Sequence, residues 1–220
     1  MAATNTKPWA VGLLRSGPEA PYVIPLGEEE LDRDAQWAMR QFERMGIQPG
    51  KPALLIGSGG DYHLLWPCED ALTRMKVPFG QAEVLAADAA RSAMFLRRLQ
   101  LQAVLGITLD ILDALPMHGL DVSRLFANMP VICAAPGAWE KLRSLGCAPW
   151  QEIRLGPLYG FQPPDEEGYL YNQDEWLLEE NEGRLLVTNR RPRMFDFKRM
   201  NFGITGRLIE VDGEKRVLLT

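Results

Sequence analysis

The sequence predicts an α/β protein: a mostly parallel sheet with helices on both faces, followed by a small antiparallel β subdomain. Two observations lead to this prediction. Between residues 28 and 155, segments with helical periodicity alternate with short apolar segments typical of strands. After residue 155, short strand-like segments are separated by turns rich in Gly, Pro, Asn and Asp. We therefore expect an α/β domain over residues 1–155 and a β-rich subdomain over residues 156–220 that packs on it.

Helical periodicity predicts five helices in the first domain. The first, Glu28–Arg44, carries apolar residues at helical spacing and ends before Gly46. The third covers residues 86–99 and is expected to place Met94, Phe95 and Leu99 on one side. The other predicted helices are 63–75, 109–115 and 137–145.

The predicted strands fall into two groups. Those of the first domain are separated by helices, so right-handed crossovers should join them into a parallel sheet. They are residues 52–56, 77–79, 103–107, 130–134 and 151–155. Those of the second part are joined by turn signals such as Val211-Asp212-Gly213-Glu214, typical of hairpins. They are residues 168–171, 176–179, 184–188, 203–211 and 216–219.

Composition excludes several classes of protein. The 220 residues carry a net charge of −5, which argues against broad nucleic-acid binding. No apolar run is long enough to span a bilayer, and the N-terminus has no apolar signal core. Cys68, Cys133 and Cys147 are far apart and form no C-x-x-C pair, so we expect reduced, buried thiols rather than a zinc site or disulfides. We expect a cytoplasmic protein without membrane contact.

Four stretches, in this order, share a further pattern. Residues 15–25 read R-S-G-P-E-A-P-Y-V-I-P, and residues 42–51 read F-E-R-M-G-I-Q-P-G-K. Residues 159–162 read Y-G-F-Q, and residues 199–207 read R-M-N-F-G-I-T-G-R. In order and context they resemble the N-terminal domain of adenylate-forming enzymes of the acyl-CoA ligase (AMP-binding) superfamily, especially phenylacetate–coenzyme A ligases. The resemblance covers about residues 13–208.

The first stretch is similar to the family's S-G-T-T-G-x-P loop, which holds the ATP phosphates. Ser16, Gly17 and Pro21 match that loop, but both threonines are missing. Glu19 takes the position of the late glycine, where a carboxylate would repel a triphosphate. The resemblance therefore implies a degenerate phosphate loop.

Two further positions depart from the family pattern. The resemblance implies that Tyr159 and Gly160 match the aromatic-Gly pair that stacks on adenine. Gln162 stands where the family has a magnesium-binding glutamate, and a neutral amide is a poor magnesium ligand. Ile204 stands where the family has an aspartate that holds the ribose hydroxyls. We expect the family's C-terminal domain, with its catalytic lysine, to be missing. We expect no ATP-dependent adenylation, no cofactor and no metal.

Residues 57–60, Gly-Ser-Gly-Gly, lie between a predicted strand and a predicted helix, where a turn can hold a phosphate. A tight turn that requires small residues is the favoured interpretation, with Asp61 capping the helix. In the resembled ligases this loop lies near the acyl pocket. Because turns at the carboxyl ends of parallel strands open on one side of a sheet, a residual pocket is predicted there. Its lining is predicted to be Ser58, Gly59, Tyr62, His63, Tyr159 and Gly160. No pocket would exist if core residues such as Leu64 and Phe161 filled it.

The remaining polar groups have mostly structural interpretations. His63 and His118 are the two histidines, and no Ser-His-Asp set can be assembled around them. The acidic runs 165–167 and 179–182 are interpreted as solvated turns rather than cation sites. The basic run 190–193 is interpreted as a charged loop, with a phosphate, a coenzyme A tail or an acidic partner as the alternatives.

Three functions are compatible with the sequence. The favoured one is a non-catalytic relative of acyl-CoA ligases that binds an acyl or aryl ligand, or its CoA ester, or serves in assembly. The second is an active enzyme of acyl or CoA-ester chemistry, completed by a partner chain. The third is an unrelated α/β domain. We also expect a homodimer or a complex with another enzyme, because an apolar surface near Phe161, Trp176 and Phe202 would need covering.

Overall fold

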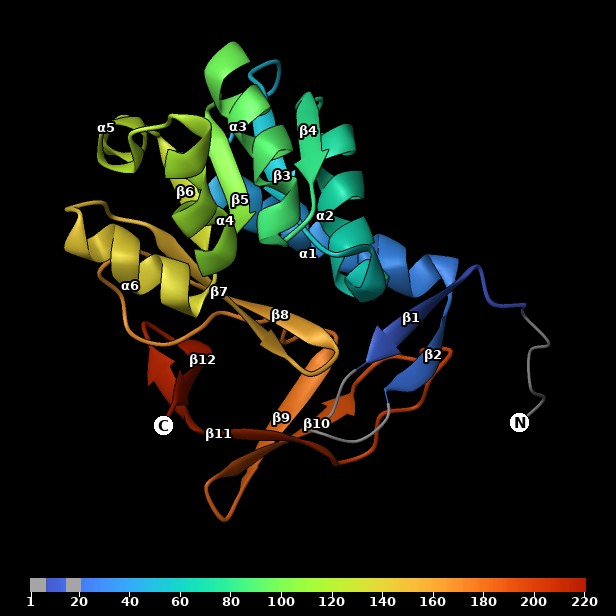
Figure 1. The fold of residues 1–220 in the computed structure, drawn as a ribbon. Helices are drawn as coiled ribbons and strands as arrows, with labels where there is room; N and C mark the ends of the chain where they lie inside the picture. Colours follow the sequence, from blue (N-terminus) through green and yellow to red (C-terminus); the bar gives the residue numbers. More distant parts are fainter. Residues whose placement is uncertain (1–6, 15–20) are drawn as a thin grey trace.

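The computed structural model describes residues 7–14 and 21–220, and its centre is a six-stranded sheet (Figure 1). The strand order is β4-β3-β5-β6-β7-β8; neighbours from β4 to β7 are parallel, and β8 is antiparallel to β7. The central strands are fully buried apolar runs, as parallel strands covered on both faces require. The strands are β3 (Ala53–Ile56), β4 (Phe79–Ala82), β5 (Ala103–Ile107), β6 (Val131–Ala134), β7 (Trp150–Leu155) and β8 (Leu158–Gln162).

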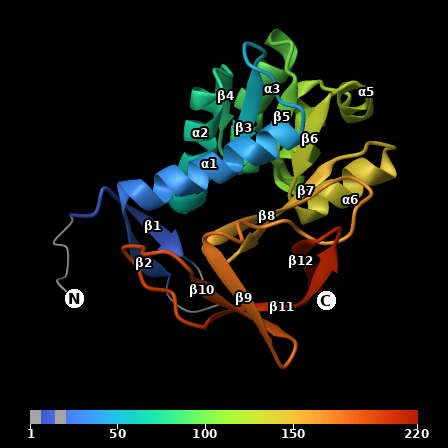
Figure 2. The same ribbon diagram turned by 180° about the vertical axis from the view of Figure 1, so that it is seen from behind.

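Helices cover both faces of this sheet, which confirms the predicted fold class. One face packs on α3, α4, α5 and α6, and the other packs on α1 and α2. Figure 2 shows α1 lying across this second face of the sheet. The helices are α1 (Glu28–Arg44), α2 (Tyr62–Arg74), α3 (Ala89–Arg98), α4 (Leu109–Ala114), α5 (Val122–Ala127) and α6 (Pro136–Ser144). Short 3₁₀ turns η1 (Gly59–Asp61), η2 (Ala86–Asp88) and η3 (Leu115–His118) connect them.

The helix predicted over residues 86–99 differs from the structure in two ways. Residues 86–88 form the separate turn η2, and α3 begins at Ala89. The buried side of α3 carries Ala89, Ala93 and Leu96, whereas Met94 is 43% exposed. The expected apolar side was therefore wrong. The small residues Ala89 and Ala93 let the helix approach the sheet closely, whereas Met94 points outward.

The C-terminal part forms a second, antiparallel sheet in the order β12-β11-β10-β9. Its hairpins β9–β10 and β11–β12 turn at Glu182-Gly183 and Asp212-Gly213, and all four residues have positive φ, as type I′ turns require. The bounds are β9 (Trp176–Asn181), β10 (Arg184–Asn189), β11 (Met200–Val211) and β12 (Glu214–Leu219).

Two backbone bridges attach this sheet to the first. Leu170 pairs with Phe161 of β8, and Tyr169 pairs with Val217 of β12. These bridges replace the strand predicted over residues 168–171, which does not form. The domain boundary at residue 155 stays a prediction, and β8, which lies beyond it, is an edge strand of the six-stranded sheet.

A two-stranded ribbon of β1 (Ala10–Leu14) and β2 (Tyr22–Leu26) closes the fold at the N-terminal end of α1 (Figure 2). Its inner face contributes Leu14, Ile24 and Leu26 to a core shared with the antiparallel sheet. Its outer face leaves Val11 and Val23 exposed. No helix in the described part of the chain has the length and apolar character needed to cross a membrane.

Candidate functional site

An open crevice of about 360 Å³ lies at the carboxyl ends of the parallel strands. Sheets of this kind bind ligands there, because the loops that follow the strands diverge and leave space. Residues from the ends of β4, β5, β6 and β7 therefore meet in this crevice, which we call the strand-end crevice. They are Val84, Thr108, Ala135, Pro136, Glu152, Ile153 and Arg154.

Glu152 is the buried acid of the strand-end crevice. Its exposed fraction is 9%. Burial raises the pKa of its carboxyl from 4.5 to about 7, although the charge of Arg154 and the Cys133 thiol act in the opposite direction. The thiol lies 3.6 Å from Glu152 Oε2 and donates a weak hydrogen bond. This carboxyl can therefore gain or lose a proton near neutral pH.

Gly106 lies beside the Glu152 carboxyl, at a point where β5 approaches β3 closely. The register of β5 against β6 shifts between Leu105 and Ile107, and Gly106 has a φ of 80°. A Cβ at this position would lie 2.1 Å from the carbonyl oxygen of Ile56. The same Cβ would lie 3.7 Å from Glu152 Oε1. A glycine is needed here both for the left-handed backbone and for the close approach of β3.

An ion pair joins β7 to the turn that follows β3. The Arg154 guanidinium donates to the Asp61 carboxylate. Asp61 occupies the N-cap position of α2, but its side chain makes no capping hydrogen bond, contrary to our expectation. The Ser58 hydroxyl instead accepts from the amide of Gly60 at 3.2 Å. At Gly57 a Cβ would lie 2.3 Å from Leu65 Cδ1, in keeping with a tight turn that needs small residues.

His63 and Tyr159, which were both predicted as ligand-binding residues, line one small cavity. Its volume is about 30 Å³, room for water-sized molecules but not for an aryl group. Leu64 and Phe161 line it too, and both are buried. Neither ring nitrogen of His63 has a hydrogen-bond partner among the described residues. Burial lowers the pKa of His63 to about 4, so this imidazole is neutral at physiological pH.

The other predicted lining residues lie elsewhere. Ser58 and Gly59 line neither this cavity nor the strand-end crevice. The Tyr62 ring stacks on Trp9 and Trp66, with ring centroids 6.3 and 5.8 Å apart. These three residues therefore do not join His63 and Tyr159.

Tyr159 and Gly160 lie within β8, not in the turn after β7 as expected. They pair with Arg154 and Ile153 across the β7–β8 hairpin. The turn itself is formed by residues 156 and 157, Gly-Pro. The expectation was wrong because a second strand follows β7 almost at once, which the Gly-Pro pair signals.

Two of the positions that the sequence resemblance predicts to be degenerate nucleotide-binding positions, Gln162 and Ile204, lie in the described part of the chain. Gln162 Nε2 donates to the carbonyl oxygen of Glu166 at 2.8 Å, so its amide belongs to its own loop. Ile204 in β11 is half-buried against the core shared with the antiparallel sheet. Ser16 and Gly17 lie outside the described residues.

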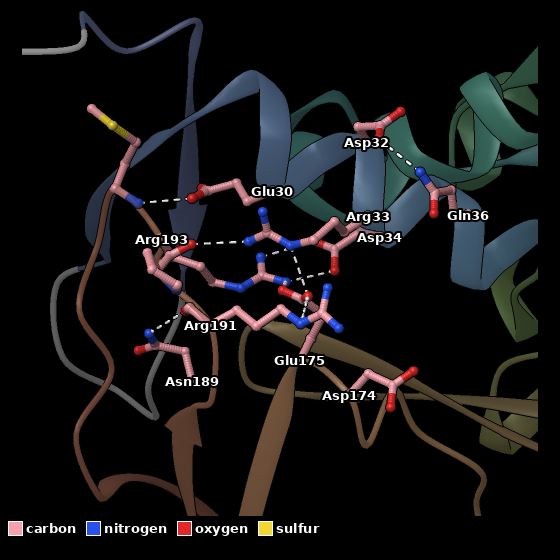
Figure 3. A network of polar contacts seen from close by, with 12 residues as sticks. Glu30, Asp32, Arg33, Asp34, Gln36, Asp174, Glu175, Asn189, Arg191 and Arg193 are labelled. Atoms are coloured by element: carbon pink, nitrogen blue, oxygen red, sulfur yellow. Dashed lines mark hydrogen bonds and ion pairs between the residues drawn. The ribbon is translucent and has the colours of Figure 1, made fainter. Parts of the chain in front are cut away.

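A second group of charges lies between α1 and the antiparallel sheet (Figure 3). We call it the α1 ionic network. Arg193 donates to Asp34 at 2.6 and 2.9 Å and to Glu175 at 3.0 Å, and its guanidinium lies 4.2 Å from the Trp176 ring centroid. Arg33 donates to Glu175 at 2.7 Å. The predicted basic loop thus has its most buried arginine engaged in structural pairs.

The two acidic runs are engaged in a similar way. Asp165 pairs with Arg143 at 3.2 Å, and Glu166 pairs with Arg216 at 2.7 Å. Glu179 pairs with Arg199. Within residues 7–14 and 21–220, no group of three or more His, Cys, Asp or Glu side chains is placed to hold a metal ion.

The dimer prediction depended on an exposed apolar surface at Phe161, Trp176 and Phe202, and these residues form no such surface. Phe161, Trp176 and Phe202 are all buried in their own chain. Contacts across the two sheets cover them, and sequence distance concealed those contacts.

Sequence reasoning missed Glu152 and Arg154. Both lie in a strand that reads W-Q-E-I-R-L, beside the entirely apolar strand β6. A charged residue in a strand expected to be covered on both faces is unusual, because burial of a charge is costly. That contrast is the signal in the sequence that would have found them.

Comparison with known proteins agrees with the fold. The sequence matches no protein-family model and no curated protein. The structure is similar to that of a 2-hydroxyisobutyryl-CoA ligase in complex with 2-HIB-AMP and CoA, with a TM-score of 0.77, 15% identity, and coverage of 98% of this chain and 57% of the ligase. It is also similar to o-succinylbenzoate coenzyme A synthetase from Bacillus subtilis, with a TM-score of 0.66, 11% identity, and coverage of 96% and 49%.

A malonyl-CoA ligase with methylmalonyl-CoA and AMP bound gives a TM-score of 0.60 at 13% identity, with coverage of 94% of this chain and 52% of that ligase. This chain thus spans roughly half the length of each ligase. The six-stranded, mostly parallel sheet and the attached antiparallel sheet together have the fold of the N-terminal domain of acyl-CoA ligases.

Proposed function

We propose that this chain is an acyl-CoA ligase-like protein, resembling the phenylacetate–coenzyme A ligases, that does not carry out ATP-dependent adenylation. It serves as a binding or assembly module for a small acyl or aryl ligand, or for its CoA ester, in the cytoplasm. The likeness of fold supports the ligase-like part of this proposal. The sequence resemblance described above supports the phenylacetate–coenzyme A ligase subgroup.

The observation that carries the proposal concerns Gln162 and Ile204. The resemblance places a magnesium-binding carboxylate at the first position and a ribose-binding carboxylate at the second. The Gln162 amide donates to the backbone of Glu166, and the Ile204 side chain packs into a core. Neither side chain supplies a negative charge, so each position loses a charge-assisted contact worth a few kcal/mol.

The strand-end crevice is the ligand site in this proposal. Its volume of about 360 Å³ suits a small organic molecule, whereas the cavity between His63 and Tyr159 does not. Among the ligases of similar fold, one was solved with 2-HIB-AMP and CoA and another with methylmalonyl-CoA and AMP. Ligands of this chemistry are therefore the first to test on this chain.

Calorimetry with ATP and magnesium tests the loss of adenylation. We expect no binding at sub-millimolar concentration, and no ATP–pyrophosphate exchange with a panel of carboxylic acids. The double variant Gln162→Glu with Ile204→Asp restores both carboxylates and is the matched control. Sub-millimolar binding of ATP by the unaltered chain would refute the proposal.

A second candidate function is an active enzyme completed by a partner chain. It is favoured by one observation, namely that the chain spans only about half of each similar ligase. Exchange activity that appears only when a second protein encoded nearby is added would establish it. The same assay without that protein is the control.

We also propose that the chain forms a homodimer. Its interface is the outer face of the β1–β2 ribbon instead of the surface predicted from the sequence. Val11, Leu13 and Val23 are exposed there. Contiguous exposed apolar residues commonly mark an interface. Light scattering should show a dimer that Val11→Lys dissociates, and a monomer at high micromolar concentration would contradict the proposal.

A further inference from the structure

Four titratable or charged groups lie near the Glu152 carboxyl. Arg154 lies on the same strand, Cys133 on β6, Tyr159 on β8 and Cys68 on α2. The neighbouring strand β5 contributes Gly106, which has no side chain. The cysteine and tyrosine groups are neutral at physiological pH, because burial raises the pKa of each one. Arg154 is therefore the one cation near this acid in the described part of the chain.

That cation is already engaged. The Arg154 guanidinium donates to Asp61, and no arginine or lysine of the described residues forms an ion pair with Glu152. The Cys133 thiol is a weak donor. Since an ionised carboxylate out of water needs strong donors, Glu152 lacks the partner that its charged form requires. Glu152 is also among the residues that line the strand-end crevice, with 9% of its surface exposed.

The rest of the crevice is mostly apolar. Val84, Ala135, Pro136 and Ile153 provide its walls. The Arg154–Asp61 pair is close to neutral, so ionised Glu152 sets the charge of the site. A ligand that complements these features has an apolar body and a positively charged end that donates hydrogen bonds.

We propose that the strand-end crevice binds a small ligand whose apolar body packs on Val84, Pro136 and Ile153 and whose ammonium or amidinium end donates to the carboxylate of Glu152. This inference rests on the proposed function for its premise that the crevice holds a ligand, and it names the class of that ligand. It also predicts the sign of a proton exchange. Glu152 releases its proton to the solvent when the cation binds, and an anionic ligand would require the opposite.

The size of the pH effect follows from the acid itself. Its pKa of about 7 means that, in the protein without ligand, the Glu152 carboxyl is mostly protonated at pH 6 and mostly ionised at pH 8. A cation that needs the ionised form should therefore bind about tenfold more tightly at pH 8 than at pH 6. A carboxylate that needs the protonated form should bind more weakly over the same range.

Three probes of nearly equal shape separate these cases: benzamidine, benzamide and benzoate. We would measure the affinity of each by calorimetry at pH 6 and pH 8. The proteins are the unaltered chain, Glu152→Gln and the matched control Glu140→Gln, whose carboxyl is exposed on α6. Benzamidine should bind most tightly, should gain about tenfold with pH, and should lose both its affinity and its pH dependence in Glu152→Gln alone. The pH series on the unaltered chain needs no variant, so the test does not depend on the folding of Glu152→Gln.

Three results would overturn the inference. The first is that benzoate binds most tightly and more so at pH 6, which leaves the proposed acyl or aryl function intact. The second is benzamidine binding that Glu152→Gln does not change. The third is no benzamidine binding at low millimolar concentration. Failure of the proposed function would instead show as ATP binding in the calorimetry described above.

Discussion

Carboxylates are largely shielded from solvent in two regions of this protein, and the two regions differ in the partners that these carboxylates have. In the α1 ionic network, Asp34 and Glu175 share the guanidinium of Arg193, and Arg33 adds a further bond to Glu175 (Figure 3). In the strand-end crevice, Glu152 has the Cys133 thiol and no arginine or lysine ion-paired to it among the described residues. The first group joins α1 to the antiparallel sheet, whereas the second faces a space that a ligand can enter.

The comparison teaches that burial alone does not give a charged group its role. A fully paired network fixes the relative position of two elements, and removal of one partner leaves a buried charge. An acid without a strong partner keeps its proton up to about neutral pH and remains responsive to whatever enters the site. Changes that add or remove a partner in either place test this distinction.

The largest effect is expected from Arg193→Met in the α1 ionic network. It removes three hydrogen bonds and leaves Asp34 and Glu175 without their shared cation. Loss of a buried partner costs about 3–5 kcal/mol of unfolding free energy, measured by urea denaturation. Arg191→Met is the matched control, since its pair with Glu175 is 3.5 Å long and its own side chain is exposed; it should cost less than about 1 kcal/mol. Equal effects of the two changes would contradict the assignment.

The second effect concerns Glu152 and pH. Because its folded pKa is raised from 4.5 to about 7, the unfolded chain loses the proton first, and stability falls as pH rises through this range. This difference between the folded and unfolded pKa values lowers the unfolding free energy by about 3 kcal/mol at pH 8. Glu152→Gln should abolish this decline in a series of urea denaturations from pH 4.5 to 8, while Glu140→Gln should leave it unchanged. A decline that persists in Glu152→Gln would show that another group causes it.

His63 should produce the opposite slope at acid pH. Its folded pKa is lowered from 6.5 to about 4, so the unfolded chain takes up a proton first and stability is lost as pH falls below 6.5. Between pH 7 and pH 5 the loss amounts to about 2 kcal/mol. His63→Leu should remove it, and His118→Leu, at the other histidine, should not. Thermal melting at the two pH values distinguishes them, and an unchanged difference in His63→Leu would be evidence against the neutral imidazole.

The smallest effect on stability, and the sharpest test of partner exchange, is expected from Asp61→Asn. The Arg154–Asp61 pair is partly exposed, so its loss should cost at most about 1 kcal/mol. The freed guanidinium then becomes available to Glu152 and should lower the pKa of that acid. The pH-dependent decline in stability, which begins at the unfolded pKa of 4.5, should therefore be smaller and end at a lower pH. A decline of unchanged size would mean that Arg154 cannot reach the acid.

Much of the fold could be predicted from local patterns. The bounds of α1 agree with the prediction because its apolar residues, from Leu31 to Phe42, recur at helical spacing on its buried side and a glycine follows its end. The strand β5 agrees because a buried parallel strand is a continuous apolar run. The buried side of α3 could not be predicted in this way, since close packing on the sheet selected Ala89 and Ala93 over larger residues.

The sequence predicted a site at the carboxyl ends of the parallel strands but not the crevice described here. None of the predicted lining residues lines the strand-end crevice. Its lining could not be predicted, because Tyr159 belongs to a strand instead of a turn and because Glu152 pairs with nothing nearby in sequence. The register between strands decides where Tyr159 lies and which groups surround Glu152. That register depends on contacts that a single sequence does not record.

Gly106 gives a means of tracing this site in other genomes. Its backbone is left-handed, and a Cβ there would lie 2.1 Å from the Ile56 carbonyl oxygen, so only glycine fits at this point of β5 beside the acid. A related sequence that keeps this glycine together with a glutamate 46 positions later should have inherited the same crevice. A sequence with any larger residue there must have rebuilt the strand, and its ligand should be sought elsewhere.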